Sequence, residues 1–152
     1  MANEAVREFF DKLAPEWQDA EEEKSIRDKL VGMMGIPEKS DIIDIGSGKG
    51  IMLAHLLKTN PETITAVDIS EKMLSYAMDR YSDPRIAFLA EDLLEAKLPE
   101  FDAAVIFNAY PHFLDKQALA EKMGAIVKPG GLFIICHSRS RQIINRGHEG
   151  GL

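Results

Sequence analysis

Three aspartates at equal spacing do most to constrain how this chain can fold. Asp44, Asp68 and Asp92 each end or follow a short apolar, β-branched run, and they stand 24 residues apart. These runs lack the alternation of apolar and polar residues that marks a half-exposed strand, and helical segments separate them. That order predicts a parallel sheet with helices on both faces. We therefore expect a doubly wound α/β domain that brings the three carboxylates to one edge of its sheet.

The remaining elements follow from residue preference and periodicity. Five strands are expected, at 41–45, 63–69, 85–90, 101–107 and 132–136. Helices are expected between them, at 51–57, after a Ser70 cap and after an Asp115 cap. The helical stripes expected to face the core, including two near the N-terminus, are Val6, Phe9, Phe10 and Leu13; Ile26, Leu30, Met33 and Met34; Met73, Leu74, Ala77, Met78 and Tyr81; and Leu119, Met123, Ile126 and Val127. Proline and glycine stand where a type II turn requires them in Lys128-Pro129-Gly130-Gly131.

Composition limits the kinds of partner. The 152 residues carry a formal charge of −7, whereas proteins that bind a nucleic-acid backbone carry a basic stripe. No apolar run approaches the roughly 18 residues of a membrane span, and the N-terminus is acidic where a signal peptide would be basic. The single cysteine, Cys136, excludes an internal disulfide and fits a reducing compartment. We expect a cytoplasmic protein that binds a small molecule, with no nucleic acid and no membrane span.

A glycine-rich loop follows the first expected strand. Ligands of doubly wound sheets bind beyond the carboxyl ends of the strands, where the loop Gly46-Ser47-Gly48-Lys49-Gly50 would lie. Its glycines would let the backbone approach a ligand, and a helix opening at Gly50 would present free N–H groups. The dinucleotide pattern Gly-x-Gly-x-x-Gly would need glycine in place of Ile51, and a P-loop would need Ser or Thr after Lys49. Since Asp44 would also repel a pyrophosphate, the loop favours a ligand with positive charge.

Two further acids suit the parts of a nucleoside. Asp68, at the end of the second strand, can accept both hydroxyl hydrogens of a ribose. Asp92, after the third strand, can accept from an exocyclic amine while Leu93 offers its backbone N–H. A single strand-end aspartate is as often a helix cap or a turn residue. Three in register beside a glycine loop favour a ligand site.

The order of these motifs resembles one known family. Class I S-adenosylmethionine-dependent methyltransferases carry successive motifs like those at Asp44–Gly50, Ala66–Ser70, Ala90–Leu93, Phe101–Val105 and Lys128–Gly131. The resemblance runs from about Phe9 to His137, and it implies a mostly parallel Rossmann-like sheet with S-adenosyl-L-methionine as cofactor. Residues 9–17, FFDKLAPEW, also look like the N-terminal helix of the ubiquinone and menaquinone biosynthesis methyltransferases.

The resemblance implies a role for each matching position. Phe10 and Trp17 would belong to an N-terminal lid, so that the single domain 1–152 comprises a helical lid (1–35), a core (41–137) and a tail (138–152). The implied cofactor contacts are Asp44, Gly46, Ser47, Gly48 and Gly50 at the methionine part, Asn108 and Ala109 beside its amino group, Asp68 at the ribose, and Ile69, Met73, Asp92 and Leu93 around the adenine.

The chemistry implied by the resemblance needs few catalytic groups from the protein. Methyl transfer is an in-line displacement at a carbon already activated by the sulfonium, so the protein mainly aligns a small-molecule acceptor and excludes water. A general base is needed only if the acceptor must lose a proton. The candidates are Tyr110 and His112, after the fourth strand, and His137 at the end of the fifth. His55, inside a buried helix, is expected to be structural, and no spacing of His, Cys and Asp resembles a metal site.

Two alternatives remain open at this stage. A nicotinamide-dependent oxidoreductase shares the fold and the strand-end acid, although the glycine spacing disfavours it. A cofactor-binding fold can also serve as a partner subunit without catalysis, because a fold does not fix a function.

The end of the sequence sets a further expectation. The family continues past its fifth strand into a helix and two more strands, whereas only residues 138–152 follow here. We expect a short basic helix in this tail and a sheet that stops, apparently truncated, after strand five. An uncovered apolar edge strand invites association. The chain would then be a truncated form, or a partner such as a second copy in a homodimer would cover that edge.

Overall fold

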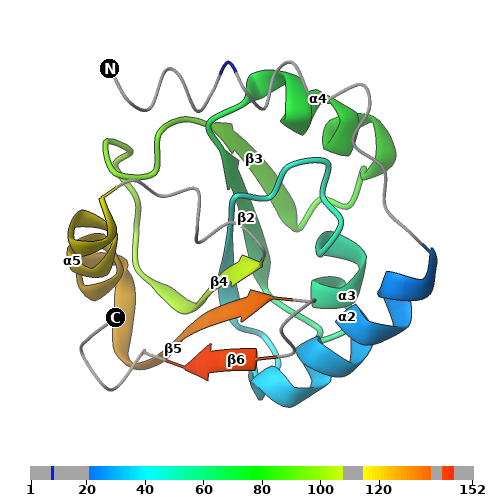
Figure 1. Ribbon diagram of the computed structural model, residues 1–152, viewed down its shortest axis with the longest axis horizontal. Helices are drawn as coiled ribbons and strands as arrows, with labels where there is room; N and C mark the ends of the chain where they lie inside the picture. The colour runs from blue at the N-terminus through cyan, green and yellow to red at the C-terminus, as the bar shows by residue number, and fades with distance from the viewer. Residues whose placement is uncertain (1–7, 9–20, 108–114, 138–141, 146–152) are drawn as a thin grey trace.

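The chain forms a single sheet of six strands (Figure 1). The computed structural model describes residues 8, 21–107, 115–137 and 142–145, to which the structural statements below refer. The strands are β1 (Asp41–Ile45), β2 (Thr63–Asp68), β3 (Ile86–Ala90), β4 (Phe101–Phe107), β5 (Val127–His137) and β6 (Gln142–Asn145). Their order is β3-β2-β1-β4-β5-β6, with β1 to β5 parallel and β6 antiparallel to β5. The predicted parallel, doubly wound sheet is confirmed.

Helices cover both faces of this sheet. Within the described residues the helices are α2 (Glu21–Met34), α3 (Leu53–Leu57), α4 (Glu71–Arg80) and α5 (Lys116–Ile126). Residues of α2 and α3 share one buried apolar cluster with the sheet, and residues of α5 share a second cluster with alternate strand positions. In Figure 1, α2 and α3 lie to one side of the strands and α5 to the other. The prediction of helices on both faces is confirmed.

Local sequence explains where these elements form. In β1, Ile42 to Ile45 are all buried, which is why the strand shows no alternation of apolar and polar residues. Both predicted helix caps are present: Ser70 Oγ accepts the Met73 N–H at 3.1 Å, and Asp115 accepts the Ala118 N–H at 2.9 Å.

Buried polar contacts join α2 to α3. Arg27 is fully buried and donates from Nε to His55 Nε2 at 3.3 Å, while the other ring nitrogen of His55 meets Asp28. Lys58 donates to both oxygens of Asp28. Hydrogen bonds from His55 and then Lys58 hold the pKa of Asp28 below its ordinary value. The prediction that His55 is a structural residue agrees with these contacts.

Three helical details differ from the sequence prediction. Met33 and Met78, both expected to face the core, are 71% and 57% exposed. In α2 the buried apolar positions are Leu30, Val31 and Met34, so the helix is rotated and Met33 points away from the sheet. The helix expected over 51–57 begins at Leu53, because residues 50–52 are used in turns.

The fifth strand is longer and less exposed than expected. It begins at Val127, and Phe101 pairs with Val127 while Ala103 pairs with Leu132, so that Lys128–Gly131 bulge out opposite Asp102. Gly130 has φ +80°, as the third position of a type II turn requires, and the predicted turn therefore lies inside the strand.

The expected helix in the tail and the expected uncovered edge are both wrong. Residues 142–145 form β6, which pairs with β5 from Ile134 to His137. The short β6 arrow runs beside β5 at the lower edge of the sheet (Figure 1). A four-residue strand that forms its hydrogen bonds with another strand is too short to show a recognisable pattern of strand-forming residues in the sequence.

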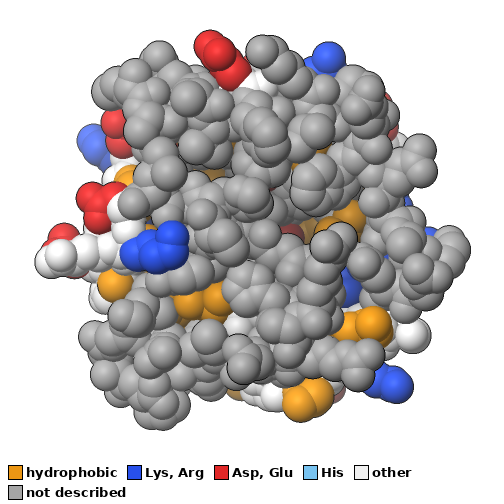
Figure 2. Space-filling model, in the orientation of Figure 1, with side chains coloured by type: hydrophobic (Ala, Val, Ile, Leu, Met, Phe, Trp, Pro, Cys, Tyr) orange, Lys and Arg blue, Asp and Glu red, His pale blue; other side chains and the backbone are white. Residues whose placement is uncertain are grey.

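The surface of the described residues mixes both charge signs. In Figure 2, hydrophobic side chains reach this face in small separate patches, and acidic and basic side chains lie close together at the left margin. Within the part of the chain that the structure describes, no helix is long and apolar enough to cross a membrane, and no group of His, Cys, Asp and Glu could hold a metal ion.

Candidate functional site

The strand order reverses beside the glycine loop. From the centre of the sheet the chain winds outward in two directions, from β1 to β3 and from β4 onward, so the order reverses between β1 and β4. Parallel strands bring their carboxyl ends to one edge, and ligands of such sheets bind there at the reversal. Asp44, Asp68 and Asp92 all lie at or just beyond this edge, as the sequence predicts.

The glycine loop is a series of tight turns held against β2. Gly46, Gly48 and Gly50 have φ of +72°, +57° and +80°, a region that glycine adopts without strain. The N–H groups of Gly46 and Ser47 both donate to Val67 O, at 2.9 and 3.0 Å. The Gly50 N–H donates to Ser47 O at 2.9 Å and α3 begins only at Leu53, so the expectation of a helix that opens at Gly50 is wrong.

Asp68 joins this loop to the start of α4. One carboxylate oxygen accepts the Gly48 N–H at 2.8 Å, and the other accepts the Ser70 N–H at 2.8 Å. A carboxylate has about four acceptor positions, so one carboxylate can accept from backbone N–H groups and from hydroxyl donors together. The sequence places Asp68 at the strand end, but its contact with Gly48 depends on how the two loops meet.

Asp44 is a buried acid directly behind the loop. It is 1% exposed, and Ser47 Oγ donates to its Oδ2 at 2.9 Å. Burial raises the pKa of Asp44 to about 7; the Ser47 hydrogen bond opposes this shift and the negative charge of Asp68 adds to it. The charged and neutral forms of Asp44 are therefore nearly balanced at neutral pH, and a nearby cation would favour the charged form.

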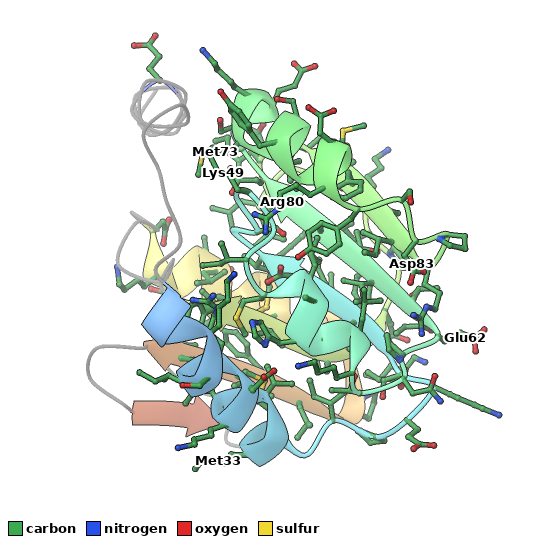
Figure 3. All side chains as sticks on the ribbon, turned by 90° about the vertical axis from the view of Figure 1, so that its right-hand side faces the viewer. Met33, Lys49, Glu62, Met73, Arg80 and Asp83 are labelled. Atoms are coloured by element: carbon green, nitrogen blue, oxygen red, sulfur yellow. The ribbon has the colours of Figure 1, made fainter. Side chains whose placement is uncertain are left out.

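Helix α4 packs closely on the loop. A Cβ built at Gly48 would lie 3.2 Å from Met73 Cε, and one at Gly50 would lie 2.9 Å from Leu53 Cδ1 and 3.1 Å from Ala77 Cβ. Figure 3 shows Met73 and Lys49 together beside α4. These two glycines are needed for the close approach of loop and helix as well as for backbone conformation.

Lys49 adds a contact that the sequence did not suggest. Its ammonium nitrogen lies 4.5 Å from the centre of the Tyr76 ring, a cation–π distance. The contact directs the positive charge of the loop toward α4. Spacing alone could not have found it, since the two residues belong to different elements.

Asp92 and Leu93 lie in the turn that follows β3. Asp92 Oδ1 accepts the Leu94 N–H at 3.0 Å, and its carbonyl accepts from Glu95 and Ala96. Leu93 is 4% exposed and belongs to the apolar cluster that contains α5. Its side chain is thus part of the core, and it can serve a ligand only through its backbone. Ile69, next to Asp68, is half-buried.

Of the remaining sequence candidates, His137 lies within the described residues and the others fall outside them. His137 ends β5 and is paired in register with Gln142. The positions outside the described ranges are Phe10, Trp17, Asn108, Ala109, Tyr110 and His112, together with the helix expected at 6–13.

The donor set distinguishes between kinds of ligand. The backbone N–H groups of Gly46, Ser47, Gly48 and Gly50 all donate within the protein. Loops that bind phosphate need such groups free and directed at the anion. Here the same loop stands beside Asp44 and Asp68, so the site suits hydroxyl groups and positive charge better than a pyrophosphate.

Comparison with known proteins agrees with this description. A family model described as a methyltransferase domain matches residues 42–131. An uncharacterized methyltransferase of Mycobacterium tuberculosis is 34% identical over 96 residues, which cover 62% of this chain and 48% of the relative. A malonyl-[acyl-carrier protein] O-methyltransferase of Acetivibrio thermocellus is 33% identical over 117 residues, covering 74% of this chain and 41% of that protein.

A solved structure points in the same direction. An S-adenosylmethionine-dependent methyltransferase of Mesorhizobium loti is 28% identical and superimposes with a TM-score of 0.63 over 70% of this chain and 50% of that one. The chain spans about half the length of the curated relatives it matches, at 48% and 41% of the two above.

Proposed function

Because this chain belongs to the class I S-adenosylmethionine-dependent methyltransferase domains, we propose that its glycine-loop edge binds S-adenosyl-L-methionine for methyl transfer to a small-molecule acceptor. The observation that carries the proposal is that two acids lie beside a loop in which the N–H groups of Gly46, Ser47, Gly48 and Gly50 already donate within the protein. This arrangement fits a cofactor that bears a sulfonium and ribose hydroxyls and has no phosphate.

The positions of the described residues support particular roles. Asp44 and the loop Gly46–Gly50 would lie at the methionine and sulfonium end, and Asp68 would accept the ribose hydroxyls. Ile69 and Met73, at the start of α4, would flank the adenine, and Asp92 with the Leu93 N–H would bind its edge. We extend the same proposal to Asn108 and Ala109, beside the methionine amino group.

The chain's task in the reaction is mainly one of position. The bound cofactor supplies an electrophilic methyl group, and an acceptor nucleophile must meet it in line. The loop and α4 would hold the cofactor, while Phe10 and Trp17 in the lid, residues 1–35, would exclude water. If the acceptor must lose a proton, Tyr110, His112 and His137 are the candidates to take it.

The acceptor and the subgroup are the finer parts of this proposal. The sequence FFDKLAPEW at 9–17 supports a place near the ubiquinone and menaquinone biosynthesis methyltransferases, whose acceptors are small molecules. Among the relatives, the Acetivibrio thermocellus protein is named for a malonyl group on a carrier protein. We propose a cytoplasmic enzyme that acts on a small molecule through the core at 41–137.

Thermal unfolding separates this function from dinucleotide chemistry. We expect S-adenosylhomocysteine, the product form of the cofactor, to raise the unfolding temperature of the chain, because a ligand that binds only the folded state stabilises it. NAD should leave that temperature unchanged. Stabilisation by NAD alone would support the oxidoreductase alternative and overturn the proposal.

The role of Asp68 has its own test. Asp68→Ala removes the proposed ribose acceptor and the bond to Gly48, so we expect the dissociation constant for S-adenosylhomocysteine to rise at least about tenfold, or 1.4 kcal/mol. Asp79→Ala, which removes an exposed acid of α4, is the matched control and should bind like the wild type. Equal affinity of both variants would remove Asp68 from the ribose role.

A further inference from the structure

Asp44 is the acid most deeply buried at the candidate site, and few hydrogen bonds offset the cost of burying its carboxyl group. Its hydrogen bond within the described chain comes from Ser47 Oγ at 2.9 Å, and the residues paired with it in the sheet, Ala66 and Val105, are apolar. By contrast, Asp68 has a backbone N–H on each of its oxygens. A buried carboxylate without a cationic partner is costly and tends to take up a proton.

Within the described ranges, the charged groups nearby do not neutralise Asp44. Lys49 directs its ammonium at the Tyr76 ring, and His55 of α3 meets Arg27 and Asp28 of α2. The charged group that acts on Asp44 is Asp68, of the same sign. Among the described residues, Asp44 therefore has no cationic partner. It lies behind the loop that would face the ligand.

We propose that Asp44, positioned by Ser47, makes this site discriminate by charge between the sulfonium form of the cofactor and its uncharged demethylated product. The inference rests on the proposed function and deepens it. S-adenosylmethionine carries one positive charge more than S-adenosylhomocysteine, at the sulfur. An ionised Asp44 stabilises that extra charge, and a protonated Asp44 does not. The site therefore favours the cofactor that can react and releases the spent one.

The selectivity between the two ligands should depend on whether Asp44 is protonated. Near neutral pH the ligand-free protein is a mixture of charged and protonated Asp44, since burial raises its pKa to about 7. Binding of the cation drives the proton from the Asp44 carboxyl into solvent, whereas binding of the neutral product does not. Acidification should accordingly weaken the affinity for S-adenosylmethionine and leave that for S-adenosylhomocysteine nearly unchanged.

The test is a calorimetric titration with both ligands between pH 6 and pH 8, in two buffers of different ionisation enthalpy. We expect the preference for S-adenosylmethionine to grow by roughly five- to tenfold over this range, and near pH 7 about half a proton more to be released with it than with the product. The sulfonium lowers the pKa of the α-amino group of S-adenosylmethionine relative to that of the product. The pH profile of the ratio is therefore compared with that of Asp44→Asn, in which the ligands titrate in the same way.

Four variants make the assignment specific. Asp44→Asn should keep only the pH dependence of the ratio that the ligands' own amino groups cause. Ser47→Ala should shift the midpoint of the profile to higher pH, because the lost hydrogen bond favoured the charged form, and Ser47→Thr should restore the wild-type profile. The control is Ser75→Ala on α4, where the Oγ donates to Lys72 O, and its profile should match the wild type.

The outcomes separate this inference from the proposed function. If the wild type and Asp44→Asn show the same pH dependence of the ratio, the inference is wrong and the function stands. If the wild type binds neither ligand at any pH, both fall. Should Asp44→Asn fail to fold, proton release by the wild type and the contrast of the two Ser47 variants still decide.

Discussion

At the scale of single residues, Asp44 must be ionised to attract a cation, whereas the folded chain is more stable when Asp44 is protonated. Its pKa of about 7 in the folded chain, against an ordinary value of 3.8, means that folding opposes its ionisation. The free energy of unfolding therefore falls as the pH rises from about 4 to about 7, and is level above that range. Residues held in an unfavourable state are typical of binding sites.

This demand predicts that Asp44→Asn is more stable than the wild type in neutral and alkaline solution. Asparagine resembles the protonated acid and can still accept from Ser47, so the loss of stability with rising pH disappears. We expect the gain over the wild type to be larger at pH 8 than at pH 5 by about 3 kcal/mol. Urea unfolding at both pH values measures it.

The control for that measurement is Asp79→Asn, at an exposed position of α4, whose stability should follow the wild type at both pH values. A gain of the same size at pH 5 and pH 8, or a loss that grows with pH, would contradict the account of Asp44.

At the scale of elements, the glycine loop and α4 form one packed unit. Asp68 bonds to both of them, and Gly48 and Gly50 lie directly against α4 or α3. The site is therefore held by close backbone packing, and the conformation of the loop is tied to that of the helix that would flank the adenine.

Two glycine substitutions of opposite sign test this packing. Gly50→Ala places a Cβ 2.9 Å from Leu53 Cδ1 on a backbone with φ +80°, and we expect it to lower the free energy of unfolding by about 1 to 3 kcal/mol. Gly124→Ala, exposed on α5 with open space at its Cβ, should raise it by about 0.5 to 1 kcal/mol. Denaturant unfolding of both variants compares them directly, and equal effects would show that Gly50 is not constrained.

The elements also show what the sequence could and could not predict. The ranges of β1 and β4 were predicted to the residue, because buried strands of a parallel sheet are continuous apolar runs. β6 was missed because its pairing depends on a free edge of β5, and the rotation of α2 that exposes Met33 depends on which face meets the sheet.

In the site, too, features set by local sequence were predicted and features set by packing were not. Asp44, Asp68 and the glycines were placed by their position after strands, which is a local signal. The bonds from Ser47 to Asp44 and from Gly48 to Asp68 appear only when β1, β2 and their loops are assembled.

At the scale of the whole molecule, the strand order defines one edge for a ligand and another for pairing. The carboxyl ends of β1 to β5 meet beside the glycine loop, and β6 adds an antiparallel strand beyond β5. A second copy approaching that side would therefore meet β6 instead of the apolar β5. The first of these edges matters most, because the proposed function and the charge discrimination both require that a nucleoside with an amino-acid tail binds there.

Calorimetric titration of the whole chain with S-adenosylhomocysteine tests that requirement most directly. We predict one binding site per chain, saturated well below roughly 1 mM ligand. A folded sample that shows no binding at that concentration would contradict the account.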